Sequence, residues 1–409
     1  MIKVKADMQQ RTKARDAGMN YKPPSWLTLS FKEVAEVITG TTPATNHSEY
    51  YGDAVPFIGP ADLGKTEPIT QSSKWLSLDG AKQARLLPAD AVLVCCIGAT
   101  IGKVGFSGRE LTTNQQINAL ICDKNVAFPR YVFHYCRTLK AMIRHQGAST
   151  TLPLLPKRRF QELEIPIPPI AEQKRIAAIL DKAEELRGLR RRALGELDAI
   201  VQSIFLEMFG DLRHSDDKEI APLSSLCHSI NDGTHKTPNY VSCGVPFVTV
   251  KNIVSGKLDF ANTKFITEAE HEELTKRTKP ERGDVLVSKD GTIGVPCPVQ
   301  TDAEFSIFVS VALLKPKPDL IDQEFLVAQL SSEWVQEQVR AGTKGIAIRH
   351  LHLVDFKRLK LLLPPLSLQQ EFARRVEAIE RLKATHRESL AHLDTLFASL
   401  QHRAFRGEL

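Results

Sequence analysis

Two long stretches of the chain carry apolar residues at alternating intervals of three and four, the pattern of a helix that buries one stripe. Forty residues of helix measure ~60 Å at ~1.5 Å per residue, more than one small domain can cover. We therefore expect the two helices to pair with each other, although a lone amphipathic helix packed on its own domain fits the same pattern. The apolar positions are 176, 180, 183, 186, 194, 197, 201, 204 and 208 in the first stretch, and 372, 376, 379, 382, 390, 393, 397 and 400 in the second.

The region before each long helix consists of short apolar runs separated by Gly, Pro, Asn and Asp. Runs such as VPFIG and DAVLVCCIG in the first region, and VPFVTV and GDVLVS in the second, predict strands of an irregular β-rich domain. A helical stretch follows in each region, over residues 128–146 and 322–341. The segments FQELEIPIPP and FKRLKLLLPP then predict a last strand that the double proline ends.

These two regions are copies of one another. Val55-Pro56-Phe57 matches Val245-Pro246-Phe247 at an offset of 190, and Pro168-Pro169 matches Pro364-Pro365 at an offset of 196 that then holds to the end of the chain. A register without gaps is expected where two helices must match in length, whereas loops tolerate insertions. The helices are therefore the frame of the repeat, and the globular parts are its variable component.

The pattern predicts an α+β fold with two β-rich domains in tandem and two long helices that pair as an antiparallel coiled coil. The expected parts are a basic tail at 1–24, a first domain at 25–168, a central helix at 169–212, a second domain at 213–364 and a C-terminal helix at 365–409.

Composition places the protein among ordinary globular chains. It has 409 residues, of which 42% are apolar and 25% are charged, and no apolar run approaches the ~18 residues of a membrane span. The N-terminus lacks the apolar stretch of a signal peptide, so we expect a cytoplasmic protein without a membrane partner. Residues 1–24 hold six basic and two acidic residues, which account for most of the net charge of +6. Charge alone therefore makes a poor case for binding DNA.

Catalytic signatures are missing from the sequence. It contains no phosphate-binding GxxxxGK[ST] loop, no HExxH, no GxSxG and no [DN]PP[YF]. Gly98 to Lys103 could be mistaken for a phosphate cradle, but the second copy, Gly291 to Gly294, lacks the lysine, so a glycine turn is the better interpretation. The seven cysteines form no CxxC pair or zinc-ligand cluster. We expect no catalytic residue, no metal site and no enzyme activity in this chain alone.

The doubled pattern VPF, K(W/F)(L/I), VLV, TIG and PP, followed each time by a long helix, resembles the specificity (S) subunit of type I restriction-modification systems. The resemblance runs from Trp26 to Leu409. It implies two target recognition domains that each read half of a split, asymmetric site in double-stranded DNA, with the helices setting the gap. It also implies docking of two methyltransferase subunits and of ATP-dependent restriction subunits, so that S-adenosylmethionine, ATP and Mg are held by those partners and this chain has no cofactor.

The resemblance assigns roles to matching residues. Thr100 to Gly102 and Thr292 to Gly294 match the family's glycine turn, and Gln173 and Gln369 match the start of its helices. Two departures weaken any shared polar role. Leu368 stands where the first copy has Glu172, and Ile307 to Val309 replace Asn114 to Gln116.

Base readout needs side chains that donate and accept hydrogen bonds, and the loops that differ most between the copies are the place to expect them. The candidates in the first copy are Thr41, Thr42, His47, Lys103, Ser149, Thr150, Lys157 and Arg158. The candidates in the second copy are Thr234, His235, Lys236, Lys251, Asn252, Lys289, Thr343, Lys344, Arg349 and His350.

Two other functions compete with this interpretation. A coiled-coil scaffold whose heads bind proteins would suit the modest net charge of the globular regions. A single-chain nuclease would need metal-binding signatures, which this sequence lacks.

Overall fold

The computed structural model describes residues 26–147, 153–210, 219–343 and 351–409. The expected tail at 1–24 therefore lies outside the described residues. The chain divides into two compact units, Met1–Arg191 with Glu388–Leu409, and Arg192–Arg387. Each unit combines one globular head with parts of both long helices. The first unit is made of two separate stretches of sequence, and the second is continuous.

The first head contains three small sheets, in the strand orders β1-β10, β2-β9-β6-β7 and β4-β3-β8-β5. Its strands are β1 (Leu27–Ser30), β2 (Ala35–Thr39), β3 (Tyr51–Ile58), β4 (Trp75–Leu76), β5 (Leu86–Leu87), β6 (Val92–Cys95), β7 (Val104–Phe106), β8 (Leu111–Thr113), β9 (Ile117–Cys122) and β10 (Glu164–Ile167). Its helices are α2 (Phe31–Val34), η1 (Ser48–Tyr50), α3 (Leu78–Gln83), α4 (Pro129–Thr138), α5 (Lys140–Gln146) and α6 (Lys157–Gln161).

The second head repeats this plan with the orders β11-β19, β12-β18-β15-β16 and β14-β13-β17. Its strands are β11 (Ile220–Pro222), β12 (Cys227–Asp232), β13 (Val245–Val248), β14 (Lys264–Ile266), β15 (Val285–Ser288), β16 (Pro296–Pro298), β17 (Ser306–Ile307), β18 (Val311–Pro316) and β19 (Lys360–Leu362). Its helices are α8 (Leu223–Leu226), η3 (Val250–Asn252), α9 (Glu268–Thr275), α10 (Gln323–Ser331), α11 (Glu333–Gly342) and α12 (Leu353–Lys357).

The repeated VLV run is the central strand of each head, and it is buried on both faces. Val92 and Val94 point into a core shared with α4 and the long helices, whereas Leu93 and Cys95 point into a second core on the other side. Alternate side chains of a strand face opposite ways, so a sheet between two cores needs an unbroken apolar run. The second head divides Val285 and Leu286 between two cores in the same way.

The predicted helical stretches are each two helices. α4 ends before Leu139 and α5 follows at once, while α10 and α11 meet at Ser332, whose hydroxyl accepts from Val335 N–H and caps α11. The predicted last strand is shorter than expected, because the segment from Phe160 first completes α6 and only then enters β10.

The long helices are α7 (Ile170–Phe209) and α13 (Leu366–Ala404), and each starts directly after a double proline. At the start of α7, the side chain of Gln173 is fully buried and makes three hydrogen bonds. Its Oε1 accepts from the N–H of Phe128, the N-cap of α4, at 2.7 Å, and its Nε2 donates to the carbonyls of Val126 and Pro168 at 3.0 and 2.8 Å. This one amide joins the helix, the proline turn and α4.

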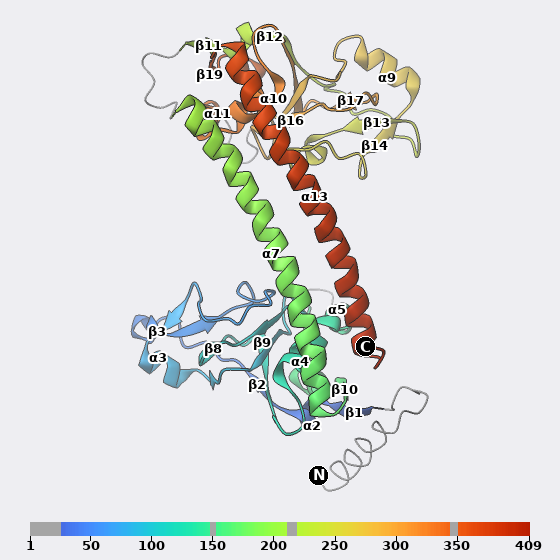
Figure 1. The fold of residues 1–409 in the computed structure, drawn as a ribbon. Helices are drawn as coiled ribbons and strands as arrows, with labels where there is room; N and C mark the ends of the chain where they lie inside the picture. The colour runs from blue at the N-terminus through green and yellow to red at the C-terminus, as the bar shows by residue number, and fades with distance from the viewer. Residues whose placement is uncertain (1–25, 148–152, 211–218, 344–350) are drawn as a thin grey trace. The chain divides into compact units, whose positions relative to one another are not determined.

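Gln369 at the start of α13 makes the matching three bonds in the second unit. Its Oε1 accepts from the N–H of Asp322, the N-cap of α10, at 2.9 Å, and its Nε2 donates to the carbonyls of Leu320 and Pro364 at 3.0 and 2.8 Å. Figure 1 shows α4 beside the first half of α7, and α10 beside the start of α13.

The apolar stripe predicted for the long helices is confirmed at most positions and wrong at Leu186 and Leu382. Ile176, Leu180 and Leu197 are buried, but Leu186 and Leu382 are 41% and 47% exposed. The neighbouring cations face inward there, with Arg187 side chain 15% exposed and Lys383 side chain 9% exposed. Within the described residues, no helix is long and apolar enough to cross a membrane.

The buried amide predicts a sharp difference between two adjacent glutamines. Gln369→Ala leaves the Asp322 N–H and two carbonyls without their partner, and we expect a loss of roughly 3 kcal/mol of unfolding free energy. Gln370→Ala, at an exposed neighbouring position, should change stability by less than ~0.5 kcal/mol. Thermal unfolding of both variants beside the parent chain measures the difference, and equal melting temperatures would contradict the role of Gln369.

Candidate nucleic-acid interface

The variable loop after β2 begins from a fixed glycine. Gly40 N–H donates to the carbonyl of Ile117 at 3.0 Å, and Thr41 N–H donates to the carbonyl of Thr113 at 2.9 Å. A Cβ on Gly40 would lie 2.2 Å from the carbonyl oxygen of Asn114, so only glycine allows this approach. The loop that carries Thr41, Thr42 and His47 is thus held at its base while its tip stays exposed.

The second head starts its loop in the same way. Gly233 N–H donates to the carbonyl of Val311 at 3.3 Å, and Thr234 N–H to that of Ile307 at 3.1 Å. A Cβ on Gly233 would lie 2.0 Å from the Ile307 oxygen. The pairs Gly40-Thr41 and Gly233-Thr234 lie 193 residues apart, so the repeat in the sequence already marks this shared loop start. The sequences diverge directly after this shared anchor.

The glycine turns are confirmed as turns. Gly102 and Gly294 adopt φ of 84° and 82°, in the left-handed region that favours glycine. Their N–H groups donate to the carbonyls of Cys95 and Ser288, each at 2.8 Å, which closes the turn between two strands. Gly102 faces Lys140 of α5, where a Cβ would come within 3.0 Å of the Lys140 carbonyl oxygen. The turn therefore supports the fold and is not arranged as a phosphate cradle.

Backbone and side-chain hydrogen bonds gather Thr41, Thr42, Lys103 and Lys157 of the first head into one loop cluster. Gly98 N–H donates to Pro153 O, and Leu155 N–H donates to Cys96 O, both at 2.8 Å, so the segment leading to Lys157 crosses the glycine turn. Gln115, beside the Thr41 anchor, is joined to Thr42 by their side chains. The cluster comprises the loops at 40–42, 97–103, 114–116 and 153–157.

The candidate side chains of the first head differ in exposure. Lys157 and Arg158 are exposed at the start of α6, and Lys103 is half-buried. His47 is exposed on its loop, stacks on Tyr50 with ring centroids 5.0 Å apart and contacts Glu49 at 2.7 Å. Ser149 and Thr150 lie outside the described residues.

In the second head a buried carboxylate organises the loop cluster. Asp232, with 3% exposure, contacts the Lys289 ammonium at 2.6 Å, Arg277 at 2.9 Å and His235 at 3.3 Å. Burial alone would raise the pKa of Asp232, but its hydrogen bond to Lys289 and the charges of Lys289 and His235 outweigh burial, so the pKa is lowered. Arg277 was missed by the sequence analysis, because nothing in a sequence pairs it with a carboxylate 45 residues earlier.

Two candidates of this head are structural in the observed conformation, contrary to expectation. Lys289 is buried against Asp232. Asn252 is 4% exposed, where its Oδ1 accepts from the Thr249 N–H and hydroxyl, and its Nδ2 donates to Asp259 O at 3.2 Å. Their polar atoms are already used by the protein, and a polar residue in a turn sequence does not reveal this.

The remaining candidates of the second head are exposed, bound to a backbone carbonyl or outside the described residues. Lys251, His235 and Lys236 are exposed, and Thr343 donates from its hydroxyl to Val339 O at 2.6 Å. Leu351 N–H donates to Lys289 O at 3.1 Å, so the chain returns to this loop cluster immediately after residue 350. Lys344, Arg349 and His350 lie outside the described residues.

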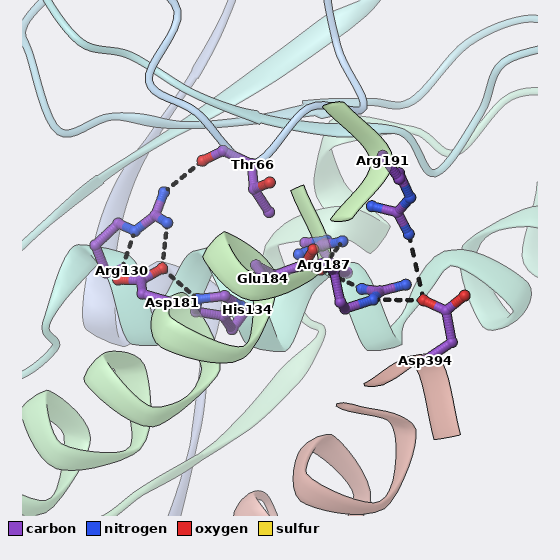
Figure 2. Close-up of polar contacts among 9 residues, drawn as sticks. Thr66, Arg130, His134, Asp181, Glu184, Arg187, Arg191 and Asp394 are labelled. Carbon is purple, nitrogen blue, oxygen red and sulfur yellow. Dashed lines mark hydrogen bonds and ion pairs between the residues drawn. The ribbon is translucent and has the colours of Figure 1, made fainter. Parts of the chain in front are cut away.

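A polar network attaches the first head to the long helices of its unit (Figure 2). The guanidinium of Arg130 on α4 binds Asp181 of α7 and the carbonyl of Thr66, and His134, fully buried, contacts Asp181 at 2.8 Å. Burial lowers the pKa of His134. Burial would raise the pKa of Asp181, but hydrogen bonds from His134 and Arg130 reverse the shift. The head is thus held to α7 by directional contacts as well as by apolar packing.

Matching ion pairs connect α7 and α13 in each unit. In the first, Arg187 contacts Glu184 at 2.8 Å and Asp394 at 2.6 Å, as Figure 2 shows. In the second, Lys383 contacts Glu380 and, at 2.6 Å, Asp198. Each residue of one cluster corresponds to one of the other at an offset of 196.

The described residues include no group of three or more His, Cys, Asp or Glu side chains that could hold a metal ion. Burial raises the pKa of Cys96, Cys122, Cys227 and Cys297 to about 12, which keeps these thiols protonated at neutral pH. The loops of the two heads remain the part of the chain most suited to recognition.

Comparison with known proteins identifies relatives over nearly the whole chain. The family described as "Type I restriction modification DNA specificity domain" matches residues 23–197 and 215–394. The specificity subunit of type I restriction enzyme EcoBI from Escherichia coli is 25% identical, covering 94% of this chain and 86% of that protein. The MjaIX specificity subunit from Methanocaldococcus jannaschii is 21% identical, covering 97% and 96%.

Solved structures share the fold. The type I restriction-modification S subunit from M. genitalium has a TM-score of 0.57 at 13% identity, covering 95% of this chain and 97% of that one. A chain from a structural study of complex assembly in the type I restriction-modification system also has a TM-score of 0.57, at 18% identity, with 95% and 100% covered.

The opposite environments of Asn252 and Lys251 predict opposite effects of truncation. Asn252→Ala removes the side chain that joins Thr249 to Asp259, and we expect a loss of roughly 1–2 kcal/mol of unfolding free energy. Lys251→Ala should leave stability within ~0.5 kcal/mol of the parent, since its side chain is exposed. Urea unfolding of the two variants tests this, and an unchanged midpoint for Asn252→Ala would refute its structural role.

Proposed function

The chain belongs to the type I restriction-modification DNA specificity family and is a specificity subunit, and from that premise we propose that its heads read the two halves of a split, asymmetric DNA site. One observation carries the proposal. Both heads start a variable loop from the same Gly-Thr anchor, and the side chains that follow differ. Two readers on one scaffold with different loops suit an asymmetric site, because base contacts are made by individual side chains.

The exposed and half-buried candidates of the two heads supply the required chemistry. Threonine hydroxyls, histidine and lysine can donate to base edges or phosphates, and the first head offers Thr41, Thr42, Lys157 and Arg158. The second offers Thr234, His235, Lys236 and Lys251, joined by Arg277, which Asp232 holds in place. Lys103, His47 and Thr343, with Ser149, Thr150, Lys344, Arg349 and His350, stay predictions from the sequence.

The long helices act as the spacer, paired as an antiparallel coiled coil. Their ion pairs support this arrangement, since Arg187 meets Asp394 in one unit and Asp198 meets Lys383 in the other. Residue numbers rise along α7 while they fall along α13, as antiparallel helices require. The buried charges at mid-helix also oppose a slip of one turn, which would separate Arg187 from Asp394 and Lys383 from Asp198.

The partners proposed for this chain are two methyltransferase subunits, ATP-dependent restriction subunits and double-stranded DNA. Exposed apolar side chains on both long helices, including Leu186, Leu189, Leu382 and Leu396, suit docking of such subunits. S-adenosylmethionine, ATP and Mg would belong to those partners, and this chain would be non-catalytic and cytoplasmic.

Methylation mapping tests the reading function directly. The chain is co-expressed with its cognate methyltransferase subunit in a host that lacks it, and methylated adenines are located by long-read sequencing. We expect one bipartite motif with a constant gap, and a chain whose residues 25–168 come from another family member should change one half of the motif only. An assembled complex that adds no new motif would return the protein-binding scaffold to first place.

Lengthening the spacer tests the paired helices. Four residues inserted after Arg192 of α7 and four after Glu388 of α13 add ~6 Å to both helices, and the offset between the helices is kept. The gap in the methylated motif should grow by one or two base pairs at ~3.4 Å each, with both half-sites unchanged. The same insertion in α7 alone serves as the control, because it breaks the match between the helices and should reduce methylation. An unchanged gap in the double insertion would exclude the helices as the ruler.

A further inference from the structure

A basic groove of about 670 Å³ lies in the first unit between α5 and the last turns of α13. Arg137, Lys140 and Arg144 line one wall, and His402 and Arg406 line the other, with Phe405 between them. No carboxylate is among the described residues that line it. A groove with this composition has a positive potential that nothing in its own wall neutralises.

Most of these cations are uncommitted. Arg137 pairs with Glu184 at 2.7 Å. Lys140, Arg144, His402 and Arg406 are exposed, and in the described part of the chain their side chains make no ion pair or hydrogen bond. Several surface cations of this protein have a carboxylate partner, as Lys82 has Asp79 and Lys124 has Asp90. Four adjacent groups without one suggest a ligand that brings its own negative charge.

The internal repeat provides a built-in comparison. At the offset of 194 that relates Phe128 to Asp322 at the starts of α4 and α10, the second copy has Ser331 in place of Arg137. The C-caps Gly147 and Thr343 set the offset at 196 along α5 and α11, where Gln336 replaces Lys140, and Arg144 corresponds to Arg340, which pairs with Glu333. At the offset of 196 for the long helices, Leu206 and Gly210 replace His402 and Arg406. The shared frame therefore does not require unpaired positive charge, because the second unit builds the same elements with neutral residues at four of these five positions and a paired arginine at the fifth.

The groove adjoins the first head's loop cluster through both ends of α5. Lys140, the first residue of α5, packs against Gly102 of the glycine turn. Gly147, its C-cap, packs against Ile101 and accepts a hydrogen bond from Leu154 N–H at 2.8 Å. Duplex DNA lying on these loops would carry its phosphates next to α5.

Resting on the proposed function, we propose that this groove binds the phosphate backbone of the DNA duplex beside the first half-site. Phosphates suit uncommitted Lys and Arg side chains, which hold them as charges and read no sequence. The first head would thereby hold DNA more tightly than the second, while the loops alone decide which bases are accepted.

The test uses the complex of the full chain with its methyltransferase subunits, and two labelled duplexes that contain the mapped motif or a scrambled one. Lys140→Ala with Arg144→Ala should weaken binding to both duplexes by a similar factor, about tenfold or more at ~0.1 M salt. The plot of log K against log salt should become shallower by about two, because two phosphate contacts are lost. Arg406→Ala, on the opposite wall, should lower the slope by about one.

The matched control is Lys82→Ala with Lys124→Ala, which removes the same charge from exposed positions of the same head. It should leave the slope unchanged, and all variants should keep the parent's melting temperature and methylated motif. An unchanged slope for the groove variants would overturn the proposal, as would loss of binding to the motif duplex alone or loss of methyltransferase subunits from the complex. If the parent complex does not prefer the motif duplex, the proposed function itself fails, whatever the groove variants do.

Discussion

The rest of the structure depends on a buried glutamine amide at the start of each long helix. Gln173 and Gln369 each bind one N–H group at the start of α4 or α10 and two carbonyls, one of them in the proline turn. Among the described residues, these backbone groups have no other partner within their own helix or turn. An amide in this position cannot shift by a residue without leaving buried polar groups unpaired, which is costly. The helix start is therefore fixed relative to α4 or α10, and through these helices relative to the sheet that supports the loops. A spacer can set a distance only if its ends are fixed in this way.

A second constraint is that the C-terminal end of a long helix packs into the core of each head. The end of α13 packs on the first head, and the end of α7 packs on the second. The ring centroid of Phe405, just after α13, lies 5.4 Å from that of Tyr131 in the first head. The ring centroid of Phe209, at the end of α7, lies 4.8 Å from that of Phe325 in the second head. Each core thus joins residues that lie far apart in the sequence. Such cores form only when both long helices are present, so the ordering of the helices and of the heads is one process.

The sequence reveals the frame of this protein and much less of its site. The repeat, the doubly buried VLV strands and the helices are predictable because each depends on a local pattern with a fixed period. Leu186 and Leu382 were misplaced because the helical stripe ignores ion pairing, and here Arg187 and Lys383 turn inward to reach carboxylates on the other helix. Asn252 and Lys289 look like readout residues in the sequence, but their polar atoms bind other groups of the protein, Thr249 and Asp259 in the local loop for Asn252 and the distant Asp232 for Lys289. Arg277 is the opposite case, a surface cation of the loop cluster that the sequence does not reveal, because only the fold brings it to Asp232.

Backbone hydrogen bonds separate the frame from the variable loops, because they hold the base of each loop without using its side chains. Gly40 and Gly233 secure the base of the variable loop through backbone groups alone, so the side chains beyond them carry little of the stability of the head. Residues at the tips can therefore change what is bound at small cost to folding. Asp232 shows the limit of that freedom, because it organises Lys289, Arg277 and His235 together, and replacing it would leave a buried lysine without its counter-charge. The proposed recognition surface of the second head thus contains one position that belongs to the frame as much as to the loop.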